Sequence, residues 1–142
     1  MLRCARIAPL LLVIGTSCAG VRSNVRFEPA PDAPALRPRP EGCHVDIHEL
    51  GNEVTRPHKV VGSLVLEASQ DELRDVGGQG ISDRLRAAAC ANGAFIVKDL
   101  KAYPNSVTGG VLYEAKAAVI LDERGNILGN EPAAAGGDAG AP

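Results

Sequence analysis

The composition of the two ends of this chain limits most strongly how it can fold. Residues 28–40 (EPAPDAPALRPRP) carry five prolines, and residues 131–142 (EPAAAGGDAGAP) are almost entirely Ala, Gly and Pro. Such segments have little apolar surface to bury and favour extended, solvated chain. The part of the 142 residues between them suffices for one small domain. We therefore expect a tether at residues 18–42, a folded domain at 43–128 and a tail without fixed structure at 129–142.

Residues 1–17 have the pattern of an export signal. Arg3 and Arg6 precede a short apolar run at residues 7–14 (IAPLLLVI). This run suits a cleaved signal, whose apolar region is roughly 7–15 residues, and falls short of the about 20 residues that a membrane-spanning helix needs. The mature chain is therefore expected to start near residue 18 and to reside outside the cytoplasm.

The residues that follow the apolar run, GTSC at 15–18, resemble the bacterial lipobox. The resemblance implies that Cys18 becomes the new N-terminus and carries acyl chains such as palmitate. Ala19, where sorting to the inner membrane would favour Asp, implies an outer-membrane anchor that faces the periplasm. Ordinary signal peptidase cleavage after Ala19 is the alternative, and it would release a soluble periplasmic or secreted protein.

The charge balance argues against a nucleic-acid partner. The chain has 15 basic and 17 acidic residues, and loss of Arg3 and Arg6 with the leader lowers the basic count to 13. Nucleic-acid binding requires clustered Lys and Arg, and single-strand binding also requires aromatic stacking platforms. The chain has no Trp, two Phe and two Tyr. We expect the membrane and an unidentified envelope protein as its partners.

The middle of the chain predicts a small α+β domain with the order β-β-α-β-β, in which one helix packs on a four-stranded sheet. Residues 43–50 alternate apolar and polar side chains, as a half-buried strand does. Gly62 lies inside a β-rich run, where glycine marks a bulge or a close backbone approach. Ser82 is the expected N-cap and Gly93 the expected left-handed residue at the helix end. The expected strands are 43–50, 59–68, 94–103 and 111–122, with a short addition at 127–128; the expected helix is 82–91, preceded by a helical turn at 71–76 and a break at 77–80.

One corner of this domain resembles a known family. Residues 85–97 (LRAAACANGAFIV) are similar to the helix-to-strand corner of small envelope domains of the YbjQ-like, heavy-metal-binding type. Those domains share the β-β-α-β-β plan with the outer-membrane stress-sensor lipoprotein of the Rcs pathway. The resemblance spans about residues 43–123 and implies that Ala89, Gly93 and Ala94 let the helix sit close on the sheet. These are packing positions, so the resemblance carries over neither a metal site nor any functional residue.

Four cysteines remain to be assigned. Cys4 leaves with the leader and Cys18 is acylated or cut away, so Cys43 and Cys90 remain. In an oxidising compartment such a pair tends to form a disulfide. Cys43 begins the first expected strand on its apolar face, and Cys90 neighbours the helix position that faces the sheet. We expect a disulfide between them; two buried free thiols are the alternative.

The remaining polar residues form no strong catalytic pattern. His44, Asp46, His48 and His58 are the candidate zinc or copper ligands, and they would gather if the first two strands paired. A solvated strand face explains the first three better, so we expect no metal site. Residues 77–83 (GGQGISD) are similar to one copy of a calcium-binding repeat, but a loop between two helical turns explains them better. Ser63 lacks a nucleophile-elbow sequence, and Glu67, Glu72 and Asp75 form no acid–base pair.

We therefore expect neither an enzyme nor a cofactor. The function that the sequence predicts is that of an envelope lipoprotein whose periplasmic domain acts as a non-catalytic binding or sensor module. The alternative is a metal-handling lipoprotein that binds zinc or copper through its surface histidines.

Overall fold

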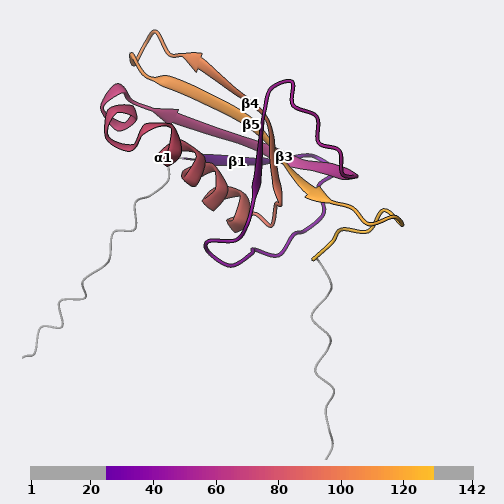
Figure 1. The fold of residues 1–142 in the computed structure, drawn as a ribbon. Coiled ribbons are helices and arrows are strands. Elements are labelled where there is room, and N and C mark those ends of the chain that lie inside the picture. Colours follow the sequence, from indigo (N-terminus) through magenta and orange to yellow (C-terminus); the bar gives the residue numbers. More distant parts are fainter. Residues whose placement is uncertain (1–24, 130–142) are drawn as a thin grey trace, which may run out of the picture.

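The computed structural model describes residues 25–129, which form one helix and five strands (Figure 1). The expected leader at residues 1–17, Cys18 and residues 130–142 of the expected tail lie outside the described residues. The elements are β1 (Val25–Pro29), β2 (Asp46–Glu49), β3 (His58–Ala68), α1 (Gln70–Ala91), β4 (Ile96–Pro104) and β5 (Val111–Ile120).

The strands form a single mixed sheet in the order β1-β3-β5-β4-β2. β3, α1 and β4 make a β-α-β unit whose two strands are separated by β5, and β5 pairs antiparallel with both. The α+β class and the pairing of β4 with β5 confirm the prediction. The prediction of four strands, with the first two paired, is wrong. β2 instead pairs parallel with β4, because β5 pairs with β3 along the whole strand and β1 takes the other side of β3.

The additional strand comes from the segment predicted to be a tether. β1 pairs antiparallel with β3 from Val25–Leu66 to Pro29–Gly62. The chain then crosses the C-terminal end of α1 to reach β2 at the opposite edge of the sheet. Leu36 packs against the core on the way, and the backbone N–H of Arg39 donates to the carbonyl of Cys90 at 2.8 Å. The domain therefore includes residues 25–42 and does not begin at residue 43. Proline is tolerated along this path because the extended chain is held mainly by side-chain packing, and few of its backbone N–H groups are needed as hydrogen-bond donors.

Gly62 performs both roles that the sequence suggested. The register of β3 against β5 shifts between Val60 and Gly62, which marks a bulge. A Cβ on Gly62 would lie 2.5 Å from the ring of Phe27 and 2.6 Å from the carbonyl oxygen of Glu28. β1 can therefore lie against β3 only because residue 62 has no side chain.

The helix begins earlier than predicted. Ser69, rather than Ser82, is the N-cap: its hydroxyl accepts from the N–H of Glu72, and the Glu72 carboxylate accepts from the N–H of Ser69. These reciprocal bonds form a capping box, which holds the pKa of Glu72 below its usual value. The first helical segment ends at Gly77, whose φ of 62° and ψ of −172° interrupt the helix. The expected break is therefore real, but it is a kink, and the helix resumes and runs through Ser82.

The kink folds the first helical segment back toward the second. Arg84 Nη1 lies 3.5 Å from Glu72 Oε1, whereas twelve residues of straight helix would separate the two positions by about 18 Å. Gly80 makes the fold possible, because a Cβ there would lie 2.5 Å from the Cβ of Val76. The helix ends at Ala91 with Asn92 as its C-cap, and Gly93 follows with φ 75°, the left-handed conformation that was predicted.

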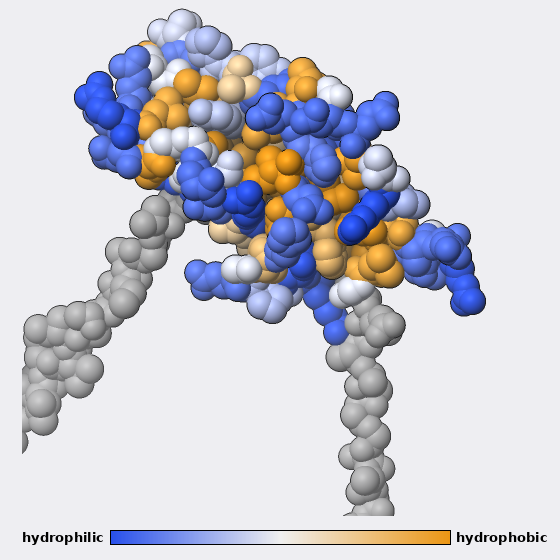
Figure 2. Space-filling model, viewed as in Figure 1, coloured by the Kyte–Doolittle hydropathy of each residue, from blue (hydrophilic) through white to orange (hydrophobic). Residues whose placement is uncertain are grey.

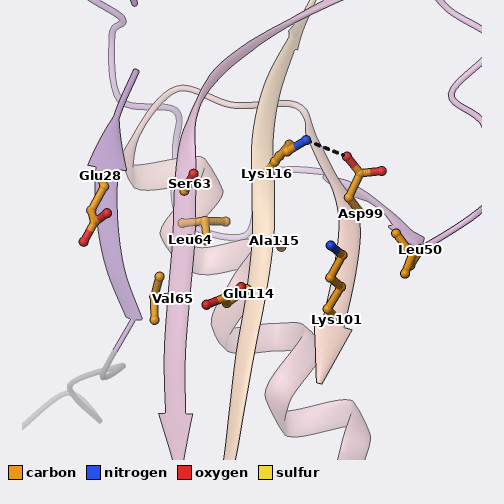
Figure 3. A pocket seen from close by; sticks show the side chains of 10 residues that line it. All are labelled: Glu28, Leu50, Ser63, Leu64, Val65, Asp99, Lys101, Glu114, Ala115 and Lys116. Atoms are coloured by element: carbon orange, nitrogen blue, oxygen red, sulfur yellow. Dashed lines mark ion pairs between the residues drawn. The ribbon is translucent and has the colours of Figure 1, made fainter. Parts of the chain in front are cut away.

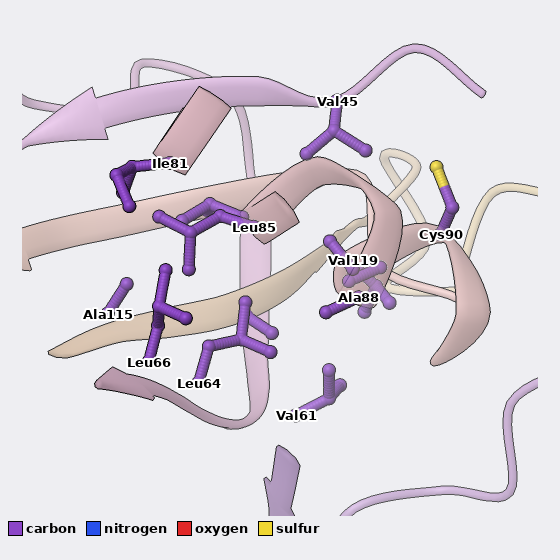
Figure 4. Packing of buried hydrophobic residues seen from close by; sticks show 14 of the residues in the cluster. Val45, Val61, Leu64, Leu66, Ile81, Leu85, Ala88, Cys90, Ala115 and Val119 are labelled. Atoms are coloured by element: carbon purple, nitrogen blue, oxygen red, sulfur yellow. The ribbon is translucent and has the colours of Figure 1, made fainter. Parts of the chain in front are cut away.

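The hydrophobic core lies between the second helical segment and one face of the sheet (Figure 4). Leu85 is fully buried and faces Leu64 and Leu66 of β3, and Ala89 is fully buried in the same cluster. Small residues on β5 and in α1, such as Ala117, keep the two layers close. The buried hydrophobic residues are Val45, Val61, Leu64, Leu66, Ala68, Ile81, Leu85, Ala88, Ala89, Cys90, Ala94, Ile96, Val97, Ala115, Ala117, Ala118 and Val119.

Cys43 and Cys90 form a disulfide, with Cα atoms 6.0 Å apart. The bond ties the chain just before β2 to the last turn of α1, and it confirms the prediction. Cys90 is almost fully buried, and Cys43 packs against the core beside it.

The helix side of the molecule carries hydrophobic and charged residues interspersed with one another (Figure 2). Within residues 25–129, α1 lacks the apolar character that crossing a bilayer would require.

Candidate functional site

Among the described residues, no helix covers one face of the sheet, and the surface of that face is the candidate functional site. In Figure 3 the helix lies behind the strands, and the labelled charged side chains stand on the viewer's side. Strand alternation explains this arrangement, since residues two apart share a face. We call this surface the open face. Its centre holds a hollow of about 430 Å³, lined by Glu28, Leu50, Ser63, Leu64, Val65, Asp99, Lys101, Glu114, Ala115 and Lys116.

A bulge in β4 shapes one wall of this hollow. Between Lys98 and Lys101 the strand advances three residues while β5 advances two, and the register against β2 shifts at the same place. Asp99 lies in this bulge with a φ of 54°, the one positive φ among the non-glycine residues from 25 to 129. That conformation is strained for a residue with a side chain, and such bulges occur next to functional sites more often than elsewhere.

The charges of the hollow are only partly paired. Lys116 Nζ lies 3.2 Å from Asp99 Oδ2, and the Asp99 side chain is 27% exposed. Lys101 and Glu114 are register partners on neighbouring strands, yet neither forms an ion pair with any residue of the described chain. The hollow thus presents an ammonium and a carboxylate side by side, both open to a ligand. Its volume lies within the range of ligand pockets, but it is open to solvent and charged, which suits a polar segment better than an apolar small molecule.

The predicted metal ligands do not come together. β5 and β4 lie between β3 and β2, so His58 and His48 are separated by three strand spacings, roughly 14 Å. His44 Nε2 pairs with Asp46 Oδ1 at 2.9 Å, and His58 Nε2 lies 3.1 Å from Lys98 Nζ. Within residues 25–129, no three His, Cys, Asp or Glu side chains are placed to hold a metal ion. The hypothesis that the four residues gather is therefore wrong, because it required the first two strands to pair.

The other residues considered in the sequence serve the fold or stand alone. Glu67 accepts hydrogen bonds from Asn105 Nδ2 at 2.8 Å and from Thr108, which fixes the loop between β4 and β5. Asp83 lies within α1 and pairs with Arg86 at 3.0 Å, so residues 77–83 form a kinked helix and not a calcium loop. Ser63 lines the hollow, but no histidine of the described chain lines it too.

Sequence reasoning missed the open face. The alternation of Glu114 and Lys116 with buried alanines on β5 was a usable signal, since it places both charges on one side of the sheet. The bulge at Asp99 had no such signal, because the local sequence KDLK fits a regular strand equally well.

The chain is thus a small α+β domain in which a five-stranded sheet has one face covered by a helix and one face open. No protein-family model and no curated protein matches it. Among solved structures, the chain has a distant similarity to the crystal structure of FvfA, described as a Francisella virulence factor. The match has 13% sequence identity and a TM-score of 0.47, and covers 66% of this chain and 94% of FvfA. This similarity is too low to transfer a function.

Proposed function

We propose that this protein is a lipid-anchored module of the bacterial envelope that binds a protein partner through the open face of its sheet. The observation that carries the proposal is the hollow between β3, β5 and β4, where Lys101 and Glu114 face solvent without ion-pair partners among residues 25–129. A polypeptide segment that carries both charge signs would complement this pair. Charged contacts of this kind determine which partner binds more than how tightly it binds.

The disulfide and the leader support the envelope location. Disulfides persist in oxidising compartments such as the periplasm, and the Cys43–Cys90 bond agrees with export. The lipobox-like residues ending at Cys18 support an outer-membrane anchor, since two or more acyl chains hold a protein stably on a membrane. Relationship to the YbjQ-like and Rcs stress-sensor domains is part of the proposal, because β2, β3, α1, β4 and β5 follow their β-β-α-β-β chain order.

Site-specific photocrosslinking in the native envelope tests the binding face. A photoreactive residue in place of Lys101 is expected to give a defined adduct with one envelope protein. The matched control places the same residue at Asp83, which is exposed on α1 and faces away from the sheet. Equal adducts from both positions, or none from position 101, would contradict the proposal.

Fractionation tests the anchor separately. Cys18→Ala is expected to move the protein from the membrane fraction to the soluble fraction and to remove the acyl mass from the intact protein. Cys4→Ala is the control, since that cysteine lies in the leader and its loss leaves the anchor unchanged. A Cys18→Ala protein that stays in the membrane fraction would exclude lipid anchoring.

A further inference from the structure

Within residues 25–129, no strand pairs with the outer edge of β1, so this edge of the sheet is free for pairing. Its backbone groups alternate between β3 and solvent, as in any antiparallel ladder. The N–H of Ala30 donates to the carbonyl of Val61 at 2.9 Å, which continues the register of β1 against β3. Even-numbered residues of β1 therefore bond to β3, and odd-numbered residues direct their backbone groups to the free edge. Val25 and Phe27 each present an N–H and a C=O there, and Pro29 presents a C=O alone.

The side chains of β1 divide between the two faces of the sheet. Val25 and Phe27 pack against the core on the helix side. Arg26 and Glu28 stand on the open face, where Arg26 Nε lies 2.9 Å from Glu28 Oε1. These two side chains are 71% and 56% exposed, so both can be reached by an approaching strand.

We propose that two copies of this chain associate through β1, which pairs antiparallel with β1 of the second copy about a two-fold axis at Phe27. In this register Phe27 lies opposite Phe27 of the second copy, and Val25 lies opposite Pro29. Four backbone hydrogen bonds form: Phe27 N–H to Phe27 C=O in both directions, and Val25 N–H to Pro29 C=O in both directions. The missing N–H of Pro29 leaves only the Val25 carbonyls without a strand partner.

The charges of β1 select this register over its neighbours. With Phe27 on the axis, Arg26 of each copy lies opposite Glu28 of the other, which extends the two internal ion pairs into one alternating network of four charges. Only shifts by an even number of residues keep the free-edge groups facing one another. A shift by two places Arg26 opposite Arg26 or Glu28 opposite Glu28, and like charges directly opposite each other are unfavourable. A shift by four leaves only one residue of each five-residue strand paired. The strand is therefore complementary to itself in a single register.

A hollow beside the edge, lined mostly by apolar residues, supports the same pairing. On the helix side, a hollow of about 510 Å³ lies between β1, the proline-rich segment and the end of α1. Its lining includes Phe27, Ala33, Leu36 and Val61. Phe27 of the second copy would lie next to this hollow and cover apolar surface that a single copy leaves open. Isologous contacts of this kind are the commonest way in which soluble proteins form closed dimers.

Charge reversal tests the proposal on the full chain, by sedimentation equilibrium in a density-matched detergent. Wild type is expected to show a reversible monomer–dimer equilibrium. Arg26→Glu alone or Glu28→Arg alone creates two like-charge pairs, so the dimer Kd is expected to rise about 10- to 100-fold. The double variant R26E/E28R restores opposite charges and is expected to restore the wild-type Kd. A mixture of the two single variants is expected to form heterodimers in preference to either homodimer.

Arg74→Glu is the matched control, because Arg74 is an exposed arginine whose carboxylate partner, Asp71, lies 3.9 Å away on α1. It is expected to leave the dimer Kd unchanged. A wild-type protein that stays monomeric up to its solubility limit would overturn the proposal. So would single reversals that weaken the dimer no more than Arg74→Glu does, or a double variant that is no tighter than the single variants.

Discussion

Breaking the disulfide between Cys43 and Cys90 is expected to remove a large part of the stability of this domain. The bond closes a loop across 47 residues of sequence. In the chain-entropy description, a cross-link over a loop of this length stabilises the folded state by about 4 kcal/mol, because it restricts the unfolded chain. The total free energy of unfolding of a domain of this size is about 5–15 kcal/mol. Reduction is therefore expected to leave the domain folded but marginal.

The structure gives a reason to expect that the fold around the bond stays ordered on reduction. The N–H of Arg39 donates to the carbonyl of Cys90, and its guanidinium donates to the carbonyl of Ala94 at 2.8 Å. The same guanidinium stacks 3.6 Å from the ring centre of Phe95, and its burial lowers the pKa of Arg39. These contacts keep the proline-rich segment on the end of α1 without the bond. Because the folded state keeps its order, the full effect on the unfolded chain is expected, and reduction should lower the free energy of unfolding by about 4 kcal/mol.

Guanidinium unfolding of the oxidised and reduced wild-type protein measures this difference without changing any side-chain volume. The double variant C43A/C90A should show the same decrease in the free energy of unfolding, plus a further decrease because the buried Cys90 side chain is truncated. The slope of the unfolding free energy against denaturant should also rise on reduction, because an uncrosslinked chain exposes more surface when it unfolds. The reasoning would be refuted by a difference below about 1 kcal/mol together with an unchanged slope.

Substitutions at three further sites, two of them with a control variant, test the local geometry by chemical denaturation. Gly62→Ala is expected to destabilise the domain by about 1–3 kcal/mol, because the new Cβ would meet Phe27. Gly78→Ala is the control: its Cβ would meet nothing within 4 Å, so it should stabilise the helix by up to about 1 kcal/mol. Equal effects of the two substitutions on stability would contradict this account. Asp99→Val should lower the free energy of unfolding by about 2 kcal/mol, because a β-branched residue tolerates the positive φ poorly. Asp99→Gly should lower it clearly less, and the reverse order would exclude backbone strain at the bulge. The lowered pKa of Glu72 adds stability that is present above its unfolded pKa of about 4.3 and lost as pH falls through the lower folded value. Glu72→Gln should therefore lower the free energy of unfolding at pH 7 and make that free energy fall less steeply as the pH is lowered. An unchanged dependence of stability on pH would argue against the capping box.

Local patterns in the sequence predicted correctly those features that depend on residues close together in the chain. The alternation in residues 43–50 correctly placed Cys43, Val45 and Ile47 on the core side, and Gly93 has the left-handed conformation expected after a helix. The disulfide followed from a count of cysteines, since the compartment left one pair to join. In the first two cases the interactions that determine the structure are between residues close in sequence, and in the third the number of cysteines was sufficient.

Only the tertiary structure decided which strands are neighbours. β1 has five residues and ends in a proline, so it carries no strand signal of its own and forms because the exposed side of β3 offers it a partner. β5 enters between β3 and β4 because it can pair along both, and this insertion separates His48 from His58. The same insertion brings Lys101 and Glu114 together beside the bulge at Asp99. Strand order depends on competition between segments far apart in the chain, and no local pattern records the outcome of that competition.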